Sequence, residues 1–397
     1  MPHIPASSAL KRYRILDLSR VRAGPTCVKQ FADFGADVIK IESPPGVDPK
    51  EGMSGPRHGF DMQNLHRNKR SMTLNLKLPE GREVFARLAK TADVVVENYR
   101  PDVKYRLGID YDSLAAINPR IILASISGFG QDGPYVDRPG FDQIAQGMSG
   151  LMSVTGAPGE GPMRTGAAIA DIAAGMFAAL GIMTALLERE QSGRGQWVQS
   201  SLLQSGVALL DFQAARYLMQ GEVAPQVGND HPTSMPTSAY KTADGYINVA
   251  ATGDGMWSRL CKAIGRDDLL RRPGFKSPPD RAVNRAELNA ELNQSFAAKK
   301  GDEWVELLNG AGVPCGPIYT IDRVFADPQV QHLGIAAPVT HPALGTIKLV
   351  NQAVTLSRTP ASMATATPEL GAHTAEVLAA AGYSDSDIAG LRERGVI

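Results

Sequence analysis

The sequence predicts an α/β protein with a parallel sheet covered by helices. Through the first 130 residues, short runs rich in Val, Ile and Leu alternate with helical patterns. The chain has 397 residues, more than one small core requires, which favours two domains. Its composition, 43% hydrophobic and 21% charged, is typical of a folded chain rather than a disordered one.

The expected elements of the first domain follow one another in regular order. Strands are predicted at 14–19, 36–42, 71–77, 92–99 and 120–128, and helices at 24–35, 79–90 and 110–118. Strands separated by helices imply parallel βαβ units. Pro79 suits the first turn of its helix, and Gly35 suits the end of the helix before it.

The rest of the chain supplies two long helical patterns and a second domain. Residues 129–165, rich in Gly, Pro and Asp, are expected to be mostly loop. One helical pattern covers 167–190, and a second, separate one runs on to Met219. The second domain is predicted to hold a strand-like stretch with an internal turn at 237–251 and helices at 257–264, 286–298 and 302–310. We assign 1–220 to a large domain, 221–330 to a linker and small domain, and 331–397, with a helix expected in 369–382, to a return to the large domain.

Charge and cysteine usage limit the partners and the compartment. Lys+Arg and Asp+Glu both count 41, so no overall field attracts nucleic acid or a membrane surface. Three scattered cysteines without a CxxC pair fit a reducing compartment. The N-terminal stretch lacks the apolar run of a signal peptide, so we expect a cytoplasmic protein.

One segment has the length and apolar character of a membrane span. Residues 167–187 read AAIADIAAGMFAALGIMTALL. Ten of these 21 residues are Ala or Gly, which are only weakly lipophilic, and Asp171 would cost about 2.5–3.5 kcal/mol near a membrane centre. We therefore predict a buried helix of a soluble protein, whose small residues let other elements approach closely.

Several common motifs are absent or incomplete. GFGQDG (128–133) matches GxGxxG, but Pro134 and Pro139 follow it, so a Gly-rich turn whose N–H groups could hold a phosphate is favoured over a dinucleotide site. The seven histidines show no HxxxH or HExxH spacing and there is no cysteine cluster, so no metal site is expected. There is also no GxSxG nucleophile elbow.

Two stretches of the first domain carry candidate binding residues. Arg67, Lys69 and Arg70 precede a predicted strand, and a solvated basic turn and a phosphate site are about equally supported there. Asn98 and Tyr99 stand at the end of another strand. Parallel sheets bind ligands beyond the carboxyl ends of their strands, which favours a binding role for this pair.

Asp171 is a lone carboxylate among small apolar residues. A capping role at a helix start is the common explanation, although Ala174 provides no capping-box partner. A carboxylate there would also be sterically open and shielded from bulk water, as a nucleophile requires. From the pattern alone, capping remains the more common use.

Taken together, several stretches resemble the class III CoA-transferases, the family of formyl-CoA transferase and carnitine CoA-transferase. The matches run in order from about residue 11 to the C-terminus. They include LDLSRVRAGP (16–25), FGADVIKIE (34–42), NKRSMTLNLK (68–77), ADVVVENYRPDVKYRLG (92–108), GPMRTGAAIADIAAG (161–175), GNDHPTSMPTSAYKTADGYI (228–247), GVPCGPI (312–318), FADPQV (325–330) and ELGAHT (369–374).

The resemblance implies both a fold and a mechanism. The fold would be a Rossmann-like, doubly wound domain built from both chain ends plus a smaller α+β domain, with two chains interlocked as a homodimer. Asp171 would be the nucleophile, passing through aspartyl anhydride and aspartyl-CoA thioester intermediates. Coenzyme A would enter as acyl-CoA substrate, with no permanently bound cofactor.

The resemblance also implies binding residues. The CoA contacts would be Arg22, Ala23, Ser43, Leu74, Asn75, Leu76, Lys77, Asn98, Tyr99, Arg100 and Arg106. Ser43 stands where the formyl-specific enzyme has Arg, and Lys69 or Arg70 could replace that phosphate contact.

Two departures from family patterns bear on the substrate. The family racemases carry Gly-His-Asp where this chain has Gly140, Phe141 and Asp142, which disfavours racemase activity and leaves these residues to shape the acyl pocket. The tetraglycine loop of formyl-CoA transferase is missing; GNDHPTSMP (228–236) stands in that region. The pattern is nearer to members that transfer CoA from succinyl-CoA to a dicarboxylic or related acid. The alternatives are an acyl-CoA racemase or isomerase and a non-catalytic acyl-CoA-binding protein.

Overall fold

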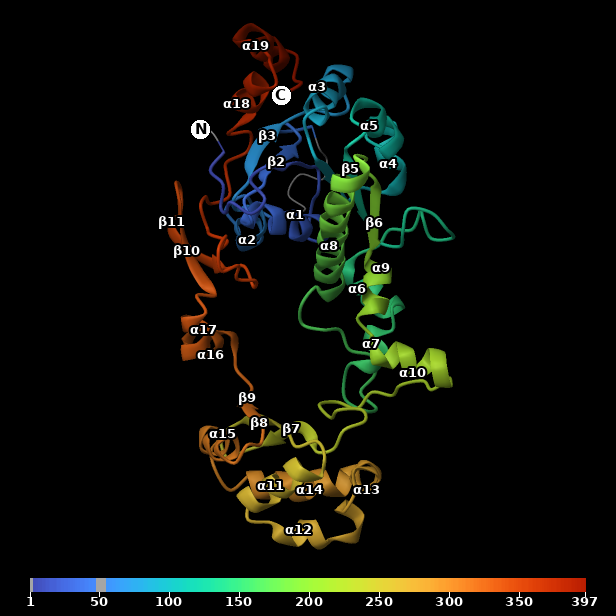
Figure 1. Cartoon of the computed structure of the whole chain (residues 1–397), viewed down its shortest axis with the longest axis vertical. Coiled ribbons are helices and arrows are strands. Elements are labelled where there is room, and N and C mark those ends of the chain that lie inside the picture. Colours follow the sequence, from blue (N-terminus) through green and yellow to red (C-terminus); the bar gives the residue numbers. More distant parts are fainter. Residues whose placement is uncertain (1–2, 48–54) are drawn as a thin grey trace. The chain divides into compact units, whose positions relative to one another are not determined.

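The chain forms two compact units in a computed structural model that describes residues 3–47 and 55–397 (Figure 1). The first unit comprises Met1–Leu151, Arg164–Glu222 and Gln329–Ile397, and the second comprises Met152–Met163 and Val223–Pro328. Residues 152–163 thus cluster with the second unit, although the sequence analysis assigns them to the large domain.

The first unit is built on a six-stranded parallel sheet in the order β3-β2-β1-β4-β5-β6. This is the strand order of doubly wound dinucleotide-binding sheets, in which the chain changes direction between β1 and β4. The parallel α/β architecture predicted from the sequence is therefore confirmed. The strands are β1 (Arg14–Asp17), β2 (Asp37–Glu42), β3 (Arg70–Thr73), β4 (Val94–Glu97), β5 (Ile122–Ser127) and β6 (Trp197–Ser201).

Helices cover both faces of this sheet. Alternate residues of β4 point to opposite faces, so Val94 and Val96 join the core beneath α1 (Ala23–Asp33) and α8 (Ile169–Ser192), whereas Val95 joins the other core. The second face is covered by α3 (Pro79–Ala89), α5 (Tyr111–Ile117), α18 (Thr374–Ala380) and α19 (Asp385–Glu393). Burial on both faces explains the continuous apolar runs of the strands.

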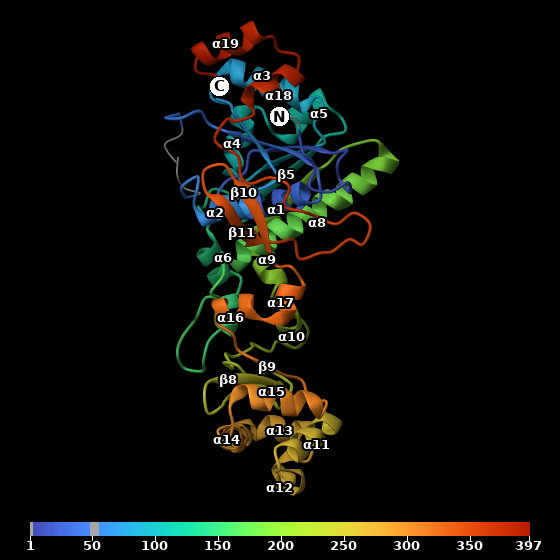
Figure 2. The same cartoon turned by 90° about the vertical axis from the view of Figure 1, so that its left-hand side faces the viewer.

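The C-terminal segment returns to the first unit. His373 N–H donates to the Ser71 carbonyl at 2.9 Å, and Asn75 N–H donates to the Val396 carbonyl at 2.7 Å. Figures 1 and 2 both show α18 and α19 (red) beside α3. The antiparallel hairpin β10 (Ala336–His341) and β11 (Gly345–Val350), which the sequence analysis did not predict, precedes them.

The helical stretch predicted to run on to Met219 begins instead with a strand. Residues Trp197–Ser201 form β6 and pair with β5, and the Trp197 indole N–H donates to the Ser125 hydroxyl. Two short helices follow, α9 (Leu202–Ala208) and α10 (Phe212–Gln220). Asp211 has φ of +46°, a left-handed conformation that interrupts the helical path between them.

The segment 129–165 is less irregular than the sequence suggests, since it contains α6 (Asp142–Met148) and α7 (Leu151–Val154). Short helices also connect the earlier strands: α2 (Phe60–His66) and α4 (Pro101–Leu107).

The second unit is a small α+β fold. Its antiparallel sheet contains β7 (Thr237–Lys241), β8 (Tyr246–Ala250) and β9 (Cys315–Pro317). Its core is rich in aromatic side chains, with Phe296 packed between Tyr240 and Trp304. Its helices are α11 (Asp254–Ala263), α12 (Asp267–Arg271), the short 3-10 helix η1 (Pro273–Phe275), α13 (Pro278–Val283), α14 (Arg285–Phe296), α15 (Gly301–Gly310) and α16 (Ile321–Ala326). Helix α17 (Pro328–His332) follows at the boundary and belongs almost entirely to the first unit.

Helix α8 is buried on one side only, which corrects the expectation of a buried helix. A Cβ atom on Gly175 would lie 2.5 Å from the Ala23 carbonyl oxygen, so the glycine permits the close contact with α1 predicted for the small residues. The opposite side exposes Met176, Phe177, Leu180, Met183 and Leu187. Within the described ranges, α8 alone is long and apolar enough to span a membrane, and half of its most apolar window is buried.

Candidate active site

A cavity of about 900 Å³ lies at the carboxyl ends of the central strands. It is the position at which open parallel sheets bind ligands, around the change of direction between β1 and β4. The cavity brings together every site residue predicted from the sequence except Asp142. They are Arg22, Ala23, Ser43, Leu74, Asn75, Leu76, Lys77, Asn98, Tyr99, Arg100, Arg106, Gly140, Phe141 and Asp171.

Asn98 links the loop after β1 to the loop after β4 through hydrogen bonds, and both loops border the centre of the cavity. Its side-chain oxygen accepts from the Arg20 N–H, and its amide group donates to the Arg20 carbonyl, both at 2.8 Å. The loop after β1 is therefore fixed to the loop after β4. This pairing holds Arg22 and Ala23 on the cavity wall, and it gives Asn98 a positioning role beside any contact with a ligand.

Asp171 lies in the first turn of α8 and reaches the cavity wall. Its side chain is partly buried. Burial above all, together with the nearby charge of Asp142, raises the pKa of the Asp171 carboxyl to about 6, against the opposing effect of Arg22. Arg22 is also paired with Asp61 at 2.7 Å. Above pH 6 the carboxylate is mainly ionised, although its environment makes that charge costly.

The other carboxylates of the cavity wall already have partners. Glu42 accepts from the Arg57 guanidinium at 2.8 Å and from the Ser71 hydroxyl at 2.6 Å. Asp102 pairs with Arg106 at 3.1 Å on the helix surface. Among the residues that the structure describes, Asp171 forms no ion pair within 4 Å. It is therefore the cavity carboxylate that is available to react.

The basic cluster that precedes β3 is neither a solvated turn nor a phosphate site. Arg67 pairs with Asp33 and Lys69 with Asp17, each in full burial, and Arg70 pairs with Asp37 and Glu376. None of these three cations lines the cavity. The suggestion that Lys69 or Arg70 replaces a phosphate contact near Ser43 is therefore wrong, because buried acidic partners already use both charges.

Three cations that the sequence analysis missed also line the cavity: Arg20, Arg82 and Arg138. Arg20 directly follows the predicted first strand, so the rule that ligands bind beyond strand ends could have identified it. Arg138 belongs to the loop between β5 and α6. The base of this loop is closed by two glycines, since a Cβ on Gly128 would lie 2.9 Å from the Gly140 Cα. Gly128 also lines the cavity, so the Gly-rich turn contributes to the site.

Phe141 and Asp142 take different roles. Phe141 lines the cavity with 58% of its surface exposed. Asp142 is buried, and its carboxylate faces the start of α8 rather than the cavity. The expectation that Asp142 shapes the acyl pocket is corrected accordingly.

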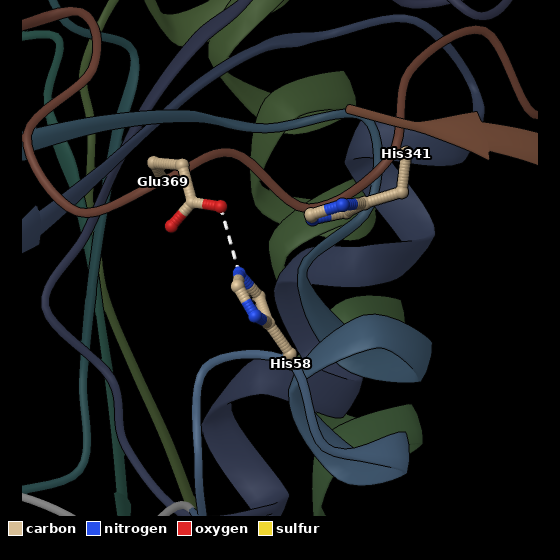
Figure 3. Close-up of side chains that lie close together, drawn as sticks. All are labelled: His58, His341 and Glu369. Carbon is tan, nitrogen blue, oxygen red and sulfur yellow. Dashed lines mark hydrogen bonds and ion pairs between the residues drawn. The ribbon is translucent and has the colours of Figure 1, made fainter. Parts of the chain in front are cut away.

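The structure also brings together His58, His341 and Glu369, a set that sequence spacing did not reveal (Figure 3). Figure 3 shows His58 hydrogen-bonded to Glu369, at 2.7 Å, with His341 beside them. His341 Nδ1 accepts from the backbone N–H groups of Ala343 and Leu344. In the neutral ring, Nε2 then carries the proton, and the lone pair of Nδ1 is already engaged by two backbone N–H groups. Neither nitrogen of His341 therefore presents a free lone pair to a metal ion in this arrangement.

Comparisons with known proteins agree with this geometry. The sequence model of CoA-transferase family III matches residues 10–374. Human succinyl-CoA:glutarate CoA-transferase is 37% identical in an alignment that covers 98% of this chain and 90% of the human protein. A formyl-CoA:oxalate CoA-transferase of Rhodopseudomonas palustris is 36% identical in an alignment that covers 98% of this chain and 97% of the bacterial protein. The crystal structure of a CAIB/BAIF family protein from Brucella suis, 34% identical, superposes with a TM-score of 0.83 over 94% of this chain and all of that one. The chain therefore belongs to CoA-transferase family III and is a class III CoA-transferase.

Proposed function

We propose that this protein transfers CoA between an acyl-CoA and a carboxylic acid with Asp171 as the nucleophile. One observation carries the proposal: Asp171 is a partly buried carboxylate on the wall of a cavity at the carboxyl ends of β1 and β4, and it pairs with no cation of the described part of the chain. A nucleophilic carboxylate needs an open approach and little competition from fixed cations. Asp171 meets both needs.

The chemistry proceeds by exchange of activated acyl bonds. The Asp171 carboxylate attacks the carbonyl carbon of the thioester. The C–S bond of the thioester then breaks, which gives an acyl-aspartyl anhydride and the CoA thiolate. The thiolate attacks the aspartyl carbonyl, releases the donor acid as a carboxylate and leaves an aspartyl-CoA thioester. The acceptor carboxylate reverses the two steps and leaves as the new acyl-CoA. No net proton or oxidant is required.

Exclusion of water is the main demand on such a site, because an anhydride hydrolyses readily. The first turn of α8 surrounds Asp171 with Ala170, Ala173 and Ala174, which are buried. This setting raises the pKa of the carboxyl to about 6 and so increases its basicity while leaving it ionised at neutral pH. The small apolar surroundings of Asp171 therefore serve the reaction.

We propose that CoA binds as a substrate along the carboxyl ends of β1 to β4, with no permanently bound cofactor. Six cations line the cavity beside Arg22: Arg20, Lys77, Arg82, Arg100, Arg106 and Arg138. Arginine and lysine side chains bind phosphate oxygens well. These six side chains line the cavity, whereas Lys69 and Arg70 do not. We assign the phosphate contacts of CoA to this set.

For the substrates, we propose succinyl-CoA as donor and a dicarboxylic acid as acceptor. Support comes from the absence of a tetraglycine run around 228–236 and from the human relative, which is named for succinyl-CoA and glutarate. The oxalate-specific relative is nearly as similar, so identity alone does not choose between the pairs. Phe141, which cannot relay a proton, supports transfer rather than racemisation.

We also propose a homodimer in the cytoplasm, without nucleic-acid or membrane partners. The apolar side chains exposed along α8 support a second chain at that face. The three cysteines, all described, are unpaired, which fits a reducing compartment.

Mass spectrometry tests the nucleophile. Wild-type protein incubated with succinyl-CoA is expected to gain a covalent CoA adduct on the peptide that contains Asp171. Asp171→Asn should form none and lose exchange between succinyl-CoA and glutarate by at least about 10³-fold. Asp110→Asn, which removes a carboxylate that caps α5 outside the cavity, is the matched control and should keep both. Full exchange by Asp171→Asn would exclude this mechanism.

A further inference from the structure

The helix that carries Asp171 lacks a capping side chain of its own. Ala168 occupies the N-cap position of α8, and its methyl side chain cannot accept a hydrogen bond. The first N–H groups of a helix have no partner within it, and an N-cap oxygen ordinarily accepts from the second or third of them. Here those groups belong to Ala170 and to Asp171 itself.

A residue 28 positions earlier supplies the missing acceptor. Asp142 Oδ1 accepts from the Ala170 N–H at 2.9 Å and from the Asp171 N–H at 3.3 Å. Asp142 is 8% exposed and begins α6, so its carboxylate joins two helices across the core. It does what an N-cap side chain does, from a distant point of the chain.

Gln146 holds the capping carboxylate in place. Its amide group donates to Asp142 Oδ2 at 2.6 Å, and its own oxygen accepts from the N–H and the hydroxyl of Thr165 at 3.0 and 3.2 Å. Gln146 is fully buried. Both oxygens of Asp142 are thus occupied, and the chain segment that leads into α8 is fixed to α6.

We propose that Asp142 is a positioning residue for Asp171: it caps the nucleophile's helix from outside and fixes the backbone from which the reacting carboxylate projects. This inference rests on the proposed role of Asp171. Asp142 does not line the cavity and touches no reacting atom, so it acts through Asp171.

The capping charge has a second effect. Asp142 places a negative charge beside Asp171 and disfavours its ionisation, which makes the ionised nucleophile more basic. The other charged groups around the pair are Arg22, which is paired with Asp61, and Arg164, at 4.0 Å from Asp142. Neither cation makes a close ion pair with Asp142, so its charge remains effective at Asp171.

Three variants separate hydrogen bonding from charge. Asp142→Asn keeps one oxygen for the two helix N–H groups but removes the charge and turns an amide group toward the Gln146 amide. The double variant Asp142→Asn with Gln146→Glu restores the hydrogen bond between positions 142 and 146, keeps an acceptor for Thr165 and moves the charge away from the helix start; it loses only the 3.4 Å bond from Gln146 to the Ala167 carbonyl. Asp110→Asn is the matched control, since Asp110 caps α5 through the Ser113 N–H.

Two measurements compare these variants with the wild type. Carbon-13 carboxyl NMR follows the titration of Asp171 without substrate, with the resonance assigned by its loss in Asp171→Asn. Succinyl-CoA to glutarate exchange gives kcat and its pH profile. Asp142→Asn should lower the Asp171 titration midpoint by about one pH unit and kcat by about 10- to 100-fold. The double variant should regain part of kcat but keep the lowered midpoint, and Asp110→Asn should change neither.

The results also separate this inference from the proposed function. If Asp142→Asn keeps the wild-type midpoint and kcat, or loses only stability, Asp142 is not a positioning residue. If Asp171→Asn retains exchange, the proposed nucleophile is wrong, whatever Asp142 does to the titration. Should Asp142→Asn not fold, the double variant, in which the hydrogen bond between positions 142 and 146 is restored, supplies the same comparison.

Discussion

Asp171 combines two properties that oppose each other in a folded protein. In the mechanism that we propose, its carboxylate must be ionised to attack a thioester, yet its place at the start of α8 withdraws it from water and sets it near Asp142. A charge in such a place costs folding free energy. In the same proposal, this environment makes the carboxylate more basic and so a stronger nucleophile.

This conflict predicts that Asp171→Asn stabilises the protein while it inactivates it. The pKa of the carboxyl rises from 3.8 to about 6 on folding, so between these values the folded state binds more protons and the wild type loses stability as pH rises. At pH 7 the variant should be more stable by on the order of 1–3 kcal/mol, and at pH 4 the difference should nearly vanish. Urea unfolding of both proteins at the two pH values measures this. Equal stability at pH 7 would mean that burial does not strain Asp171.

The predicted binding residues that line the cavity and those that do not differ in the range of their contacts. Asn98 and Arg22 follow strands, so their place at the cavity follows from the rule for parallel sheets. The partners of Arg67 and Lys69 are Asp33 and Asp17, which are 34 and 52 residues away. Such pairs exist only once the strands align, so no local pattern distinguishes them from a solvated basic turn.

At the scale of elements, the contact between α1 and α8 positions the two sides of the site. Helix α1 begins with Ala23 on the cavity wall, and α8 begins two residues before Asp171. Their close approach depends on Gly175. The small residues of α8 thus bring Asp171 near the loop after β1.

We expect Gly175→Ala to damage both stability and activity. The new Cβ would lie 2.5 Å from the Ala23 carbonyl oxygen, a backbone atom that cannot move alone. Overpacking costs about 1–3 kcal/mol, which outweighs the roughly 1 kcal/mol that Ala gains over Gly in a helix. The matched control is Gly255→Ala in α11, where the new methyl group has room and stability should rise. Thermal unfolding and exchange activity compare the two; equal behaviour would show that the helices separate without cost.

The elements that the sequence analysis missed are those whose pattern is not local. Trp197–Ser201 is a strand because β5 offers an open edge, whereas its own residues continue a helical pattern. In the hairpin β10–β11, burial alternates, but β10 buries only Val339 and His341 and no residue of β11 is fully buried, so the apolar pattern is weak. By contrast, β1, β2, β4 and β5 contribute apolar residues to the cores on both faces of the sheet, and their apolar runs identified them directly.

At the scale of the whole molecule, one chain leaves apolar surface uncovered. Leu180 and Leu187 on α8 are 63% and 69% exposed, and Leu218 and Met219 on α10 are 80% and 82% exposed. Large exposed apolar patches on soluble chains mark interaction surfaces. Composition alone suggested that α8 is buried. The structure divides that helix into one side that faces the core and one side that faces outward.

We predict that a second copy of this chain covers the outward side of α8, as the proposed homodimer requires. Light scattering at micromolar concentration should give twice the chain mass of 42.3 kDa. Leu180→Glu with Leu187→Glu places two charges in the interface, where unpaired charge is costly, so the dimer should weaken and the melting temperature fall. Leu180→Met with Leu187→Met keeps the surface apolar and should leave the dimer intact. A monomeric wild type that binds lipid vesicles through this helix would instead assign the surface to a membrane.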